Sequence, residues 1–517
     1  MEDQHWLSSL GVIAHWTIVL LLGLRVINKR QSPEFSLAWI AVVAAFPYVG
    51  AVAYLVVAEP WLSERRTRRI ASLTDSAREK LRERLQTSPR NPEQTYHEAV
   101  MGLRRLAAST NAMPLVFNNH VELLDDFDAI FPRLMEDVRS ARRSIDLLFF
   151  IFQPKGRVLE FVDELIAAAG RGVRVRVVVD GVGGRQLLKS PHAARLRDAG
   201  VDLRASLPVR FLRIYAARVD IRNHRKLVVI DEAVAYTGSF NIIDPAQFKR
   251  GEGVGRWVDI MARITGPSIP AFKAAFEIDR ALETNEDPFA AVERDIEEAA
   301  AAQRAELEEA SVADGTTSQP LASGQRRLFP TIDTGDAPIQ IVPSGPGQNP
   351  GTLHKLLLHA VHGAEEELVI SSPYFMPDPA MMLALEAARE RGVRLVVVSP
   401  RRIDGPLVAL ATRGFLRDLH EQGVEVLLYT GGLLHAKTVV VDRSFCMLGT
   451  ANFDRRSFWI NFELNIFAYD AATSRRLRDI QQRYMDGSIP FDECSIANRG
   501  KAFVTLENAA QLASPLL

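Results

Sequence analysis

The sequence predicts a duplicated α/β protein that is preceded by two membrane-crossing helices. Three observations carry this prediction. Two apolar segments lie near the N-terminus, strands alternate with amphipathic helices from about residue 115, and the same alternation returns after residue 339. Because each copy of the pattern is the size of a domain, the repeat indicates two related halves and not a solenoid.

Length and composition are those of an ordinary folded protein. The chain has 517 residues, enough for two or three domains, and a net charge of −1. A dedicated nucleic-acid-binding protein normally carries a basic excess, so we expect no nucleic acid partner. The two cysteines, Cys446 and Cys494, form neither a metal-ligand pattern nor a disulfide framework, which fits a reducing compartment.

The first 60 residues are expected to form a transmembrane α-hairpin of two spans. Residues 7–24 are mostly apolar, and residues 35–58 contain no charged side chain. Each segment is about long enough to cross a bilayer, and Pro47 is expected to kink the second one. The acidic start, MEDQ, argues against a cleaved signal peptide. A buried soluble hairpin is the alternative.

Basic residues around the two apolar segments predict their orientation. The turn between the segments holds Arg25, Lys29 and Arg30. A larger basic group follows the second segment, at Arg65, Arg66, Arg68 and Arg69. By the positive-inside rule, the long C-terminal part is then cytoplasmic, close to anionic lipid headgroups.

The order of elements after the apolar segments favours a largely parallel or mixed sheet. Residues 144–152 read as a buried strand, 158–171 as an amphipathic helix and 172–180 as a second strand. We therefore divide the chain into the spans (1–60), a juxtamembrane helical connector (61–112), a first half (113–281), an acidic, low-complexity linker (282–335), a second half (336–490) and a C-terminal tail (491–517).

One polar motif occurs in both halves. An isolated His–Lys pair is usually an ordinary surface pair, but HAKTVVVD at 435–442 matches HRKLVVID at 224–231 at a constant offset of 211 residues. The match continues beyond the strand, so each copy reads H-x-K-x4-D-x6-G-[ST]-x-N. The residues concerned are His224, Lys226, Asp231, Ser239 and Asn241 in the first copy and His435, Lys437, Asp442, Thr450 and Asn452 in the second.

The spacing of the motif has a chemical meaning. Residues i and i+2 of a strand point to the same face, so each His projects together with its Lys. Two such strands facing each other would gather two imidazoles, two ammonium groups and two amides around one point. That set suits a phosphodiester: lysines neutralise the non-bridging oxygens, one imidazole attacks phosphorus, and the other protonates the leaving alkoxide.

Two further carboxylates are expected to support the histidines. A nucleophilic imidazole needs an acceptor on its other nitrogen, and Asp259 and Glu463 lie on the next strand-like segments of the two halves. Asp231 and Asp442 close the motifs, but their separation from the histidines favours a structural salt bridge or turn over direct proton transfer. No cluster has metal-ligand spacing, so we expect neither a metal nor another cofactor.

The doubled H-x-K-x4-D pattern resembles the phospholipase D superfamily, in which two α/β halves share one active site. Over nearly its whole length the chain is similar to bacterial cardiolipin synthases of the two-span A type. The stretches that carry the likeness include SLAWIAVVAAFPYVGAVAYLV, DIRNHRKLVVID, YTGSFNIIDP, VPSGPG, SSPYFMPD, GGLLHAKTVVVD and ANFDRRSFWINFE. The resemblance implies a multi-pass protein of the bacterial inner membrane.

The resemblance also implies a reaction, phosphatidyl transfer between two phosphatidylglycerol molecules. His224 and His435 become nucleophile and general acid/base, with His224 as the nucleophile by the family's more common pattern. Lys226 and Lys437 bind phosphate, and Asp259 and Glu463 orient the imidazoles. The alternatives are a membrane phospholipase D that transfers to water, a nuclease, and a silent scaffold. Other donor lipids and acceptor alcohols stay open, and no obligate protein partner is evident.

Overall fold

The computed structural model describes residues 2–29, 33–55, 62–85, 98–110, 112–208, 220–284, 337–348, 351–493 and 500–514. The described chain divides into two compact units. The N-terminal unit contains Met1–Glu64, and the second, here called the α/β unit, contains Arg65–Pro208 and Arg222–Pro515. The predicted linker (282–335) lies almost entirely outside the described residues.

The N-terminal unit is helical. It consists of α1 (Glu2–Asn28), α2 (Pro33–Ala45) and α3 (Pro47–Ala53), which pack around Val26, Val43 and Tyr54. The kink expected at Pro47 is present as a break between α2 and α3, since Pro disfavours helical geometry in the residue before it and Phe46 is non-helical at φ −134° and ψ 71°. Within the described part of the chain, every helix is too short or too polar for a membrane span.

The connector packs into the α/β unit. Its helices are α4 (Glu64–Leu85) and α5 (Glu98–Ser109). α4 buries Ala77 and Leu81 in the core that also holds α10 of the first half, whereas α5 buries Leu103 and Ala107 against α12 and α13 of the second half. The amphipathic faces of these helices are therefore part of both cores, although their composition is polar.

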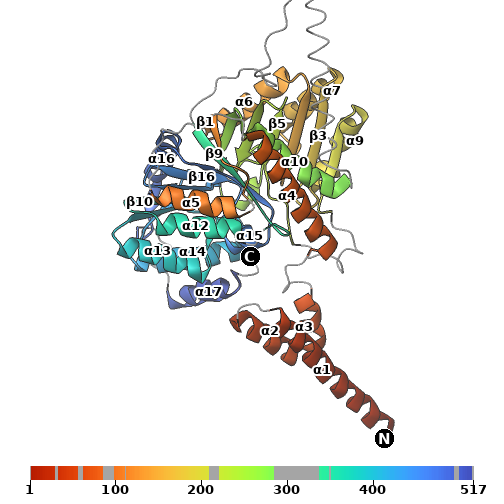
Figure 1. Cartoon of the computed structure of the whole chain (residues 1–517). Helices are drawn as coiled ribbons and strands as arrows, with labels where there is room; N and C mark the ends of the chain where they lie inside the picture. The colour runs from red at the N-terminus through yellow and green to blue at the C-terminus, as the bar shows by residue number, and fades with distance from the viewer. Residues whose placement is uncertain are drawn as a thin grey trace, which may run out of the picture. The chain divides into compact units, whose positions relative to one another are not determined.

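The two halves repeat the same order of elements (Figure 1). In the first half these are β1 (Val116–Leu124), α6 (Phe127–Ser140), β2 (Ser144–Phe149), α7 (Val158–Gly170), β3 (Arg174–Asp180), α8 (Arg185–Leu188), α9 (Pro191–Asp198), β4 (Asp202–Ser206), β5 (Leu227–Ile230), β6 (Val234–Gly238), β7 (Trp257–Val258), β8 (Met261–Thr265) and α10 (Ile269–Thr284).

The second half adds a longer C-terminal part to this order. It consists of β9 (Ala337–Ser344), α12 (Thr352–His362), β10 (Glu367–Ser371), β11 (Phe375–Met376), α13 (Pro379–Glu390), β12 (Arg394–Pro400), α14 (Pro406–Glu421), β13 (Glu425–Tyr429), β14 (Leu433–Leu434), β15 (Thr438–Val441), β16 (Phe445–Gly449), β17 (Phe453–Asp454), α15 (Arg455–Trp459), β18 (Glu463–Ala468), α16 (Ala471–Asp486), β19 (Ser488–Pro490) and α17 (Lys501–Leu512).

Each half is built on a mixed sheet, as the sequence predicted. β2, β3 and β4 are parallel and β5 is antiparallel to β2; likewise β10, β12 and β13 are parallel and β15 is antiparallel to β10. β9 pairs with both β1 and β18, which joins the halves into one run of 15 strands. The near-continuous apolar composition of β3 and β12 follows from helices covering both faces.

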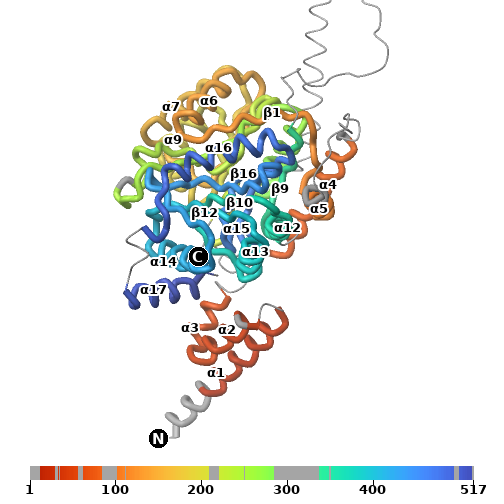
Figure 2. Tube along the Cα trace, turned by 90° about the vertical axis from the view of Figure 1, so that its left-hand side faces the viewer, coloured from red at the N-terminus to blue at the C-terminus, as the bar shows by residue number. Residues whose placement is uncertain are grey.

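Short β pairings between the two halves bring the two motifs together. β14, just before the second motif, pairs with β7 of the first half, and Asn223, just before the first motif, forms a bridge with Phe462 of the second half. Figure 2 shows the same chain from the side, with the first half in orange to green and the second half in teal to blue. Each histidine is therefore held by backbone hydrogen bonds to the opposite half.

Candidate active site

His224 and Lys226 lie at the start of β5, where the chain enters the core. The backbone N–H of His224 donates to Phe462 O at 2.9 Å, and Lys226 Nζ donates to His224 O at 2.7 Å. The apolar strand LVVI that follows is fully buried and fixes both residues. Side-chain exposure of His224 is 20%, which leaves one face of the ring accessible.

His435 and Lys437 have the same local arrangement before β15. The backbone N–H of His435 donates to Val258 O at 2.7 Å, and Lys437 Nζ donates to His435 O at 2.6 Å. The strand TVVV that follows is again buried. The side chain of His435 is only 7% exposed, so the second histidine is the more enclosed of the two.

The carboxylate partners of the histidines cross between the halves. His435 Nδ1 lies 2.6 Å from Asp259 Oδ1, and His224 Nδ1 lies 3.3 Å from Glu463 Oε1. The motif hydroxyls anchor these acids: Ser239 Oγ donates to Asp259 at 2.6 Å and Thr450 Oγ1 donates to Glu463 at 2.5 Å. A carboxylate can only accept here, so His435 donates from Nδ1 to Asp259 and presents Nε2 away from the acid. Glu463 Oε1 lies near His224 Nδ1 but makes no hydrogen bond with any described residue.

An aromatic ring covers each imidazole, but the polar neighbours of the two Nδ1 atoms differ. The Phe150 ring lies 4.2 Å from the His224 ring, and the Trp257 ring lies 4.4 Å from the His435 ring, measured between centroids. His224 Nδ1 also has the Asn461 amide at 3.3 Å. Two polar groups therefore lie near His224 Nδ1, the Glu463 carboxylate and the Asn461 amide, each at 3.3 Å. His435 Nδ1 has the Asp259 carboxylate at the shorter distance of 2.6 Å.

Burial sets the charge state of the site. It lowers the pKa of His435 to about 4, together with the charges of Lys437 and Lys226 and against the opposing effect of Asp259. Burial also lowers the pKa of Lys226 to about 8, and burial plus the charge of Lys226 lowers that of Lys437. Two ammonium groups that repel one another in a low-dielectric site are stabilised when an anion binds between them.

Arg225, between the motif His and Lys, was not predicted as a site residue. It is fully buried and bonds to both halves: Nη1 to Asp279 at 2.7 Å, Nε to Glu463 O at 3.0 Å and Nη2 to Ser344 O at 3.1 Å. Arg225 thereby holds β5, α10, β9 and β18 in register. Its position between two motif residues could have indicated this role, because a charged side chain that is buried beside a strand needs polar partners.

The motif aspartates lie away from the histidines. Asp231 accepts the backbone N–H groups of Arg142, Arg143 and Ser144, and Asp442 accepts those of Glu365, Glu366 and Glu367. Each follows its strand at the far end from the histidine, on the order of 20 Å along the chain. Their carboxylates close the turn before β2 or β10, which is the structural arrangement that their separation from the histidines favours.

The motif asparagines take unequal positions. Asn241 Oδ1 accepts the backbone N–H of Ile151 at 3.1 Å, which fixes the loop after β2 beside Phe150. Asn452 Oδ1 is buried and has no hydrogen-bond partner among the described residues, and its backbone N–H donates to Ser457 Oγ at 3.1 Å. Asn241 therefore acts on the loop, while the Asn452 amide oxygen keeps acceptor capacity.

A second inter-half contact flanks His435. Lys249 Nζ donates to Asp404 Oδ2 at 2.6 Å, and Tyr374 Oη donates to Asp404 Oδ1 at 2.6 Å. Lys249 Nζ also lies 6.0 Å from the ring centre of Trp257, the ring that covers His435. Although burial acts to raise it, the pKa of Asp404 is lowered by Lys249 and Tyr374, so this cluster keeps a carboxylate charge near His435.

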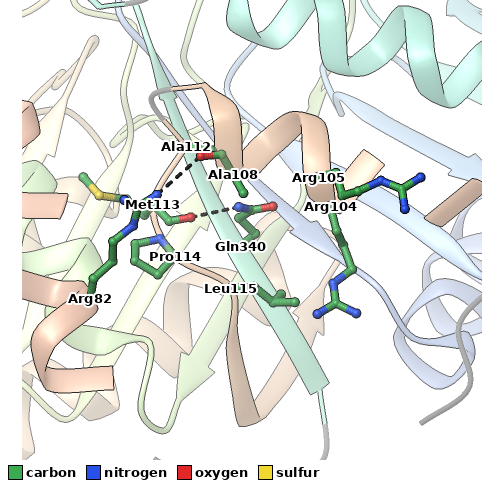
Figure 3. Close-up of a pocket in the computed structure, with 9 residues that line it drawn as sticks. All are labelled: Arg82, Arg104, Arg105, Ala108, Ala112, Met113, Pro114, Leu115 and Gln340. Atoms are coloured by element: carbon green, nitrogen blue, oxygen red, sulfur yellow. Dashed lines mark hydrogen bonds between the residues drawn. The ribbon is translucent and has the colours of Figure 1, made fainter. Parts of the chain in front are cut away.

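A pocket of about 350 Å³ lies elsewhere in the α/β unit, between α4, α5 and β9 (Figure 3). Arg82 Nη2 donates to Ala108 O at 3.4 Å, and Gln340 Nε2 donates to Met113 O at 2.9 Å. The first bond joins α4 to α5 and the second joins β9 to the segment before β1. The pocket lining contains none of the motif residues. Among the described residues, no group of three or more His, Cys, Asp or Glu side chains has the geometry to hold a metal ion.

The geometry and the sheet order define a duplicated phospholipase D-like α/β fold. A family model described as "Cardiolipin synthase, PLD-like domain" matches residues 134–254 and 357–485, and one described as "Phospholipase_D-nuclease N-terminal" matches residues 15–58. A solved phosphatidylserine synthase from Haemophilus influenzae Rd KW20 covers 81% of this chain and 100% of its own, at a TM-score of 0.56 and 15% identity. That likeness concerns the fold alone.

Similar curated proteins extend over almost the whole chain. Cardiolipin synthase A of Salmonella arizonae is 33% identical over 489 residues, which are 93% of this chain and 92% of that protein. Cardiolipin synthase A of Erwinia tasmaniensis is 32% identical over 519 residues, 99% of each chain. The chain therefore belongs to the cardiolipin synthase family.

Proposed function

We propose that the protein is a phosphatidyltransferase that makes cardiolipin and glycerol from two molecules of phosphatidylglycerol. One observation carries the proposal: two histidines, each paired with a carboxylate of the opposite half, flank two buried lysines. The non-bridging oxygens of a phosphodiester would give the two lysine ammonium groups an anionic partner. Family membership supports the choice of phosphatidylglycerol as donor and acceptor.

In the first half-reaction, His224 Nε2 attacks phosphorus and the bond to the headgroup glycerol oxygen breaks. His435 gives its proton to that oxygen, so free glycerol leaves and a phosphatidyl-histidine forms. We assign attack to His224 because its ring is the more accessible one, at 20% against 7% side-chain exposure. The negative charge of the bound phosphodiester favours the protonated form of His435, which burial disfavours in the empty site.

In the second half-reaction, the headgroup hydroxyl of another phosphatidylglycerol attacks the phosphatidyl-histidine. His435 takes the hydroxyl proton, the bond from phosphorus to His224 Nε2 breaks, and cardiolipin is released with both histidines restored. Lys226 and Lys437 stabilise the extra negative charge of each transition state. Transfer to an alcohol needs a site that limits access of water, and the rings of Phe150 and Trp257 over the imidazoles contribute to that exclusion.

We further propose that the N-terminal unit attaches the enzyme to the bacterial inner membrane as a multi-pass anchor. Many of its large apolar side chains are exposed, among them Trp16, Leu20, Leu37, Phe46 and Val49. In water such a surface is unfavourable, whereas in lipid it is not. The basic residues after this unit favour a cytoplasmic position for the α/β unit.

Purified full-length protein tests the function. The protein in detergent is given phosphatidylglycerol as the only lipid, with a chelator present, and products are identified by mass spectrometry. We expect cardiolipin and an equal amount of glycerol, lost in His224→Ala and in His435→Ala but kept in His192→Ala, a histidine on the surface of α9. Phosphatidic acid as the main product, or product formation by either active-site variant, would contradict the proposal.

A further inference from the structure

The connections that follow the parallel strands lie at the same edge of each half as its histidine. His224 precedes Leu227, which pairs with Leu148 at the end of β2, and His435 precedes Thr438, which pairs with Ser371 at the end of β10. The helices that follow parallel strands begin at the strands' C-terminal edge. The N-terminal ends of α7, α8 and α14 are therefore on the histidine edge of their halves.

Large apolar side chains are exposed at these connections. Leu159 in the first turn of α7 is 37% exposed, Val182 between β3 and α8 is 48% exposed, and Leu407 in the first turn of α14 is 45% exposed. Leu383 near the start of α13 and Trp459 of α15, which precedes Asn461 at His224, are exposed as well. Scattered apolar residues are ordinary on a surface, but Leu159, Val182 and Leu407 each lie at the histidine edge of their own half.

Exposed basic side chains accompany the apolar ones. Lys155 precedes Leu159, Arg185 follows Val182, and Arg401 precedes Leu407, and all three are exposed. The connections after β3 and β12 carry no exposed acidic residue, since Asp404 is buried against Lys249. We call Leu159, Val182, Leu407, Lys155, Arg185 and Arg401 the apolar–basic rim.

We propose that the apolar–basic rim is the surface by which the α/β unit lies on an anionic phospholipid bilayer, with the apolar side chains among the headgroups and the basic ones on lipid phosphates. This combination is the one that interfacial membrane binding requires, apolar area plus positive charge. The rim borders the site in both halves, so a lipid phosphate enters without leaving the interface. The inference rests on the proposed function and adds the surface through which its substrate arrives.

Photo-crosslinking in vesicles tests the rim directly. Benzoylphenylalanine replaces Val182 or Leu407 in the full-length protein, and the matched control places it at Glu421, an exposed residue at the other end of α14. With vesicles of phosphatidylglycerol and phosphatidylcholine, we expect lipid adducts at 182 and 407 in several-fold excess over 421. Equal yields at the three positions, or crosslinks to a second protein chain in place of lipid, would overturn the inference.

Kinetics separate the rim from the chemistry. The variant Leu159→Glu/Val182→Glu/Leu407→Glu is expected to turn over long-chain phosphatidylglycerol in vesicles about tenfold more slowly, because three acidic side chains repel the anionic surface. Turnover of monomeric dihexanoyl phosphatidylglycerol, which needs no bilayer, should stay at the wild-type value. An equal loss of turnover with both substrates would refute the role of the apolar–basic rim in membrane binding. Failure of the wild-type protein to form cardiolipin from either substrate would instead refute the proposed function, whatever the crosslinking pattern.

Discussion

The two motif histidines share one local sequence pattern but differ in their surroundings. His435 is enclosed, lies 2.6 Å from Asp259 and is covered by Trp257, whereas His224 is more open and lies 3.3 Å from Glu463, with Asn461 beside the same nitrogen. The backbone of the two motifs is nearly identical, so the difference comes from the residues that the opposite half supplies. A duplicated fold can thus give two copies of one motif different tasks.

The largest expected effect is on the carboxylate partners. Asp259→Asn should lower kcat by about 100-fold or more, because the short bond that fixes the His435 tautomer is lost. Glu463→Gln should cost only about tenfold, since Glu463 Oε1 lies 3.3 Å from His224 Nδ1 and makes no hydrogen bond with any described residue. Steady-state rates on phosphatidylglycerol measure both losses, and circular dichroism checks the fold. Equal losses of kcat in the two variants would contradict the inferred difference between the two histidines.

The second effect is on pH dependence. Lys226 binds phosphate as the cation, and burial lowers its pKa to about 8, so the affinity for phosphatidylglycerol should be constant just below that pH and fall, as an alkaline limb, when pH rises through it. Glu463 raises the pKa of Lys226. Glu463→Gln should therefore move the alkaline limb to lower pH, while Glu160→Gln on the surface of α7 should leave it in place. A limb near pH 10 in the wild type would contradict this assignment.

A smaller effect is expected at the inter-half contact beside Trp257. Lys249→Met removes the ion pair with Asp404 and leaves a buried carboxylate that accepts from Tyr374 among the described residues. We expect kcat to fall several-fold because Trp257 and the ring of His435 lose support, and Asp404→Asn in the same background should restore part of the activity. No recovery in the double variant would argue against the uncompensated charge as the cause.

The smallest expected effect on activity is at the motif aspartates, where the two halves are alike. Asp231→Asn and Asp442→Asn should each lower the free energy of unfolding by about 1–3 kcal/mol, because backbone N–H groups lose a charged acceptor. The loss should be the same in both halves, since each carboxylate accepts three equivalent N–H groups. Denaturant melts measure it. A variant that stays folded but loses all activity would place its aspartate in the chemistry.

The parts of the site that repeat in the sequence were predictable from it. The constant offset between the motifs indicated that His224 and His435 meet, and the strand period placed Lys226 and Lys437 beside them. Asp259 and Glu463 were found because each is an acid in an apolar strand pattern of its half. The expected spans stay a prediction, because no described helix is long and apolar enough for one.

The parts that depend on the exchange between halves were not predictable. Sequence periodicity gives the face of a strand but not which strand of the other half lies opposite, so the crossing of Asp259 to His435 and of Glu463 to His224 needed the three-dimensional structure. The same holds for Trp257 and Phe150 over the imidazoles. Arg225 was missed because its partners, on α10, β9 and β18, are distant in sequence.

The most direct test of an unequal pair of histidines is to locate the covalent intermediate. Wild-type protein and His435→Ala are mixed with phosphatidylglycerol, quenched within milliseconds at alkaline pH, where phosphohistidine survives, and digested for mass spectrometry. The account predicts the phosphatidyl group on the peptide that contains His224 in the wild-type protein, and no adduct on this timescale in His435→Ala, which lacks the acid for the leaving glycerol. An adduct on the peptide containing His435, or an equal distribution over both histidines, would contradict it.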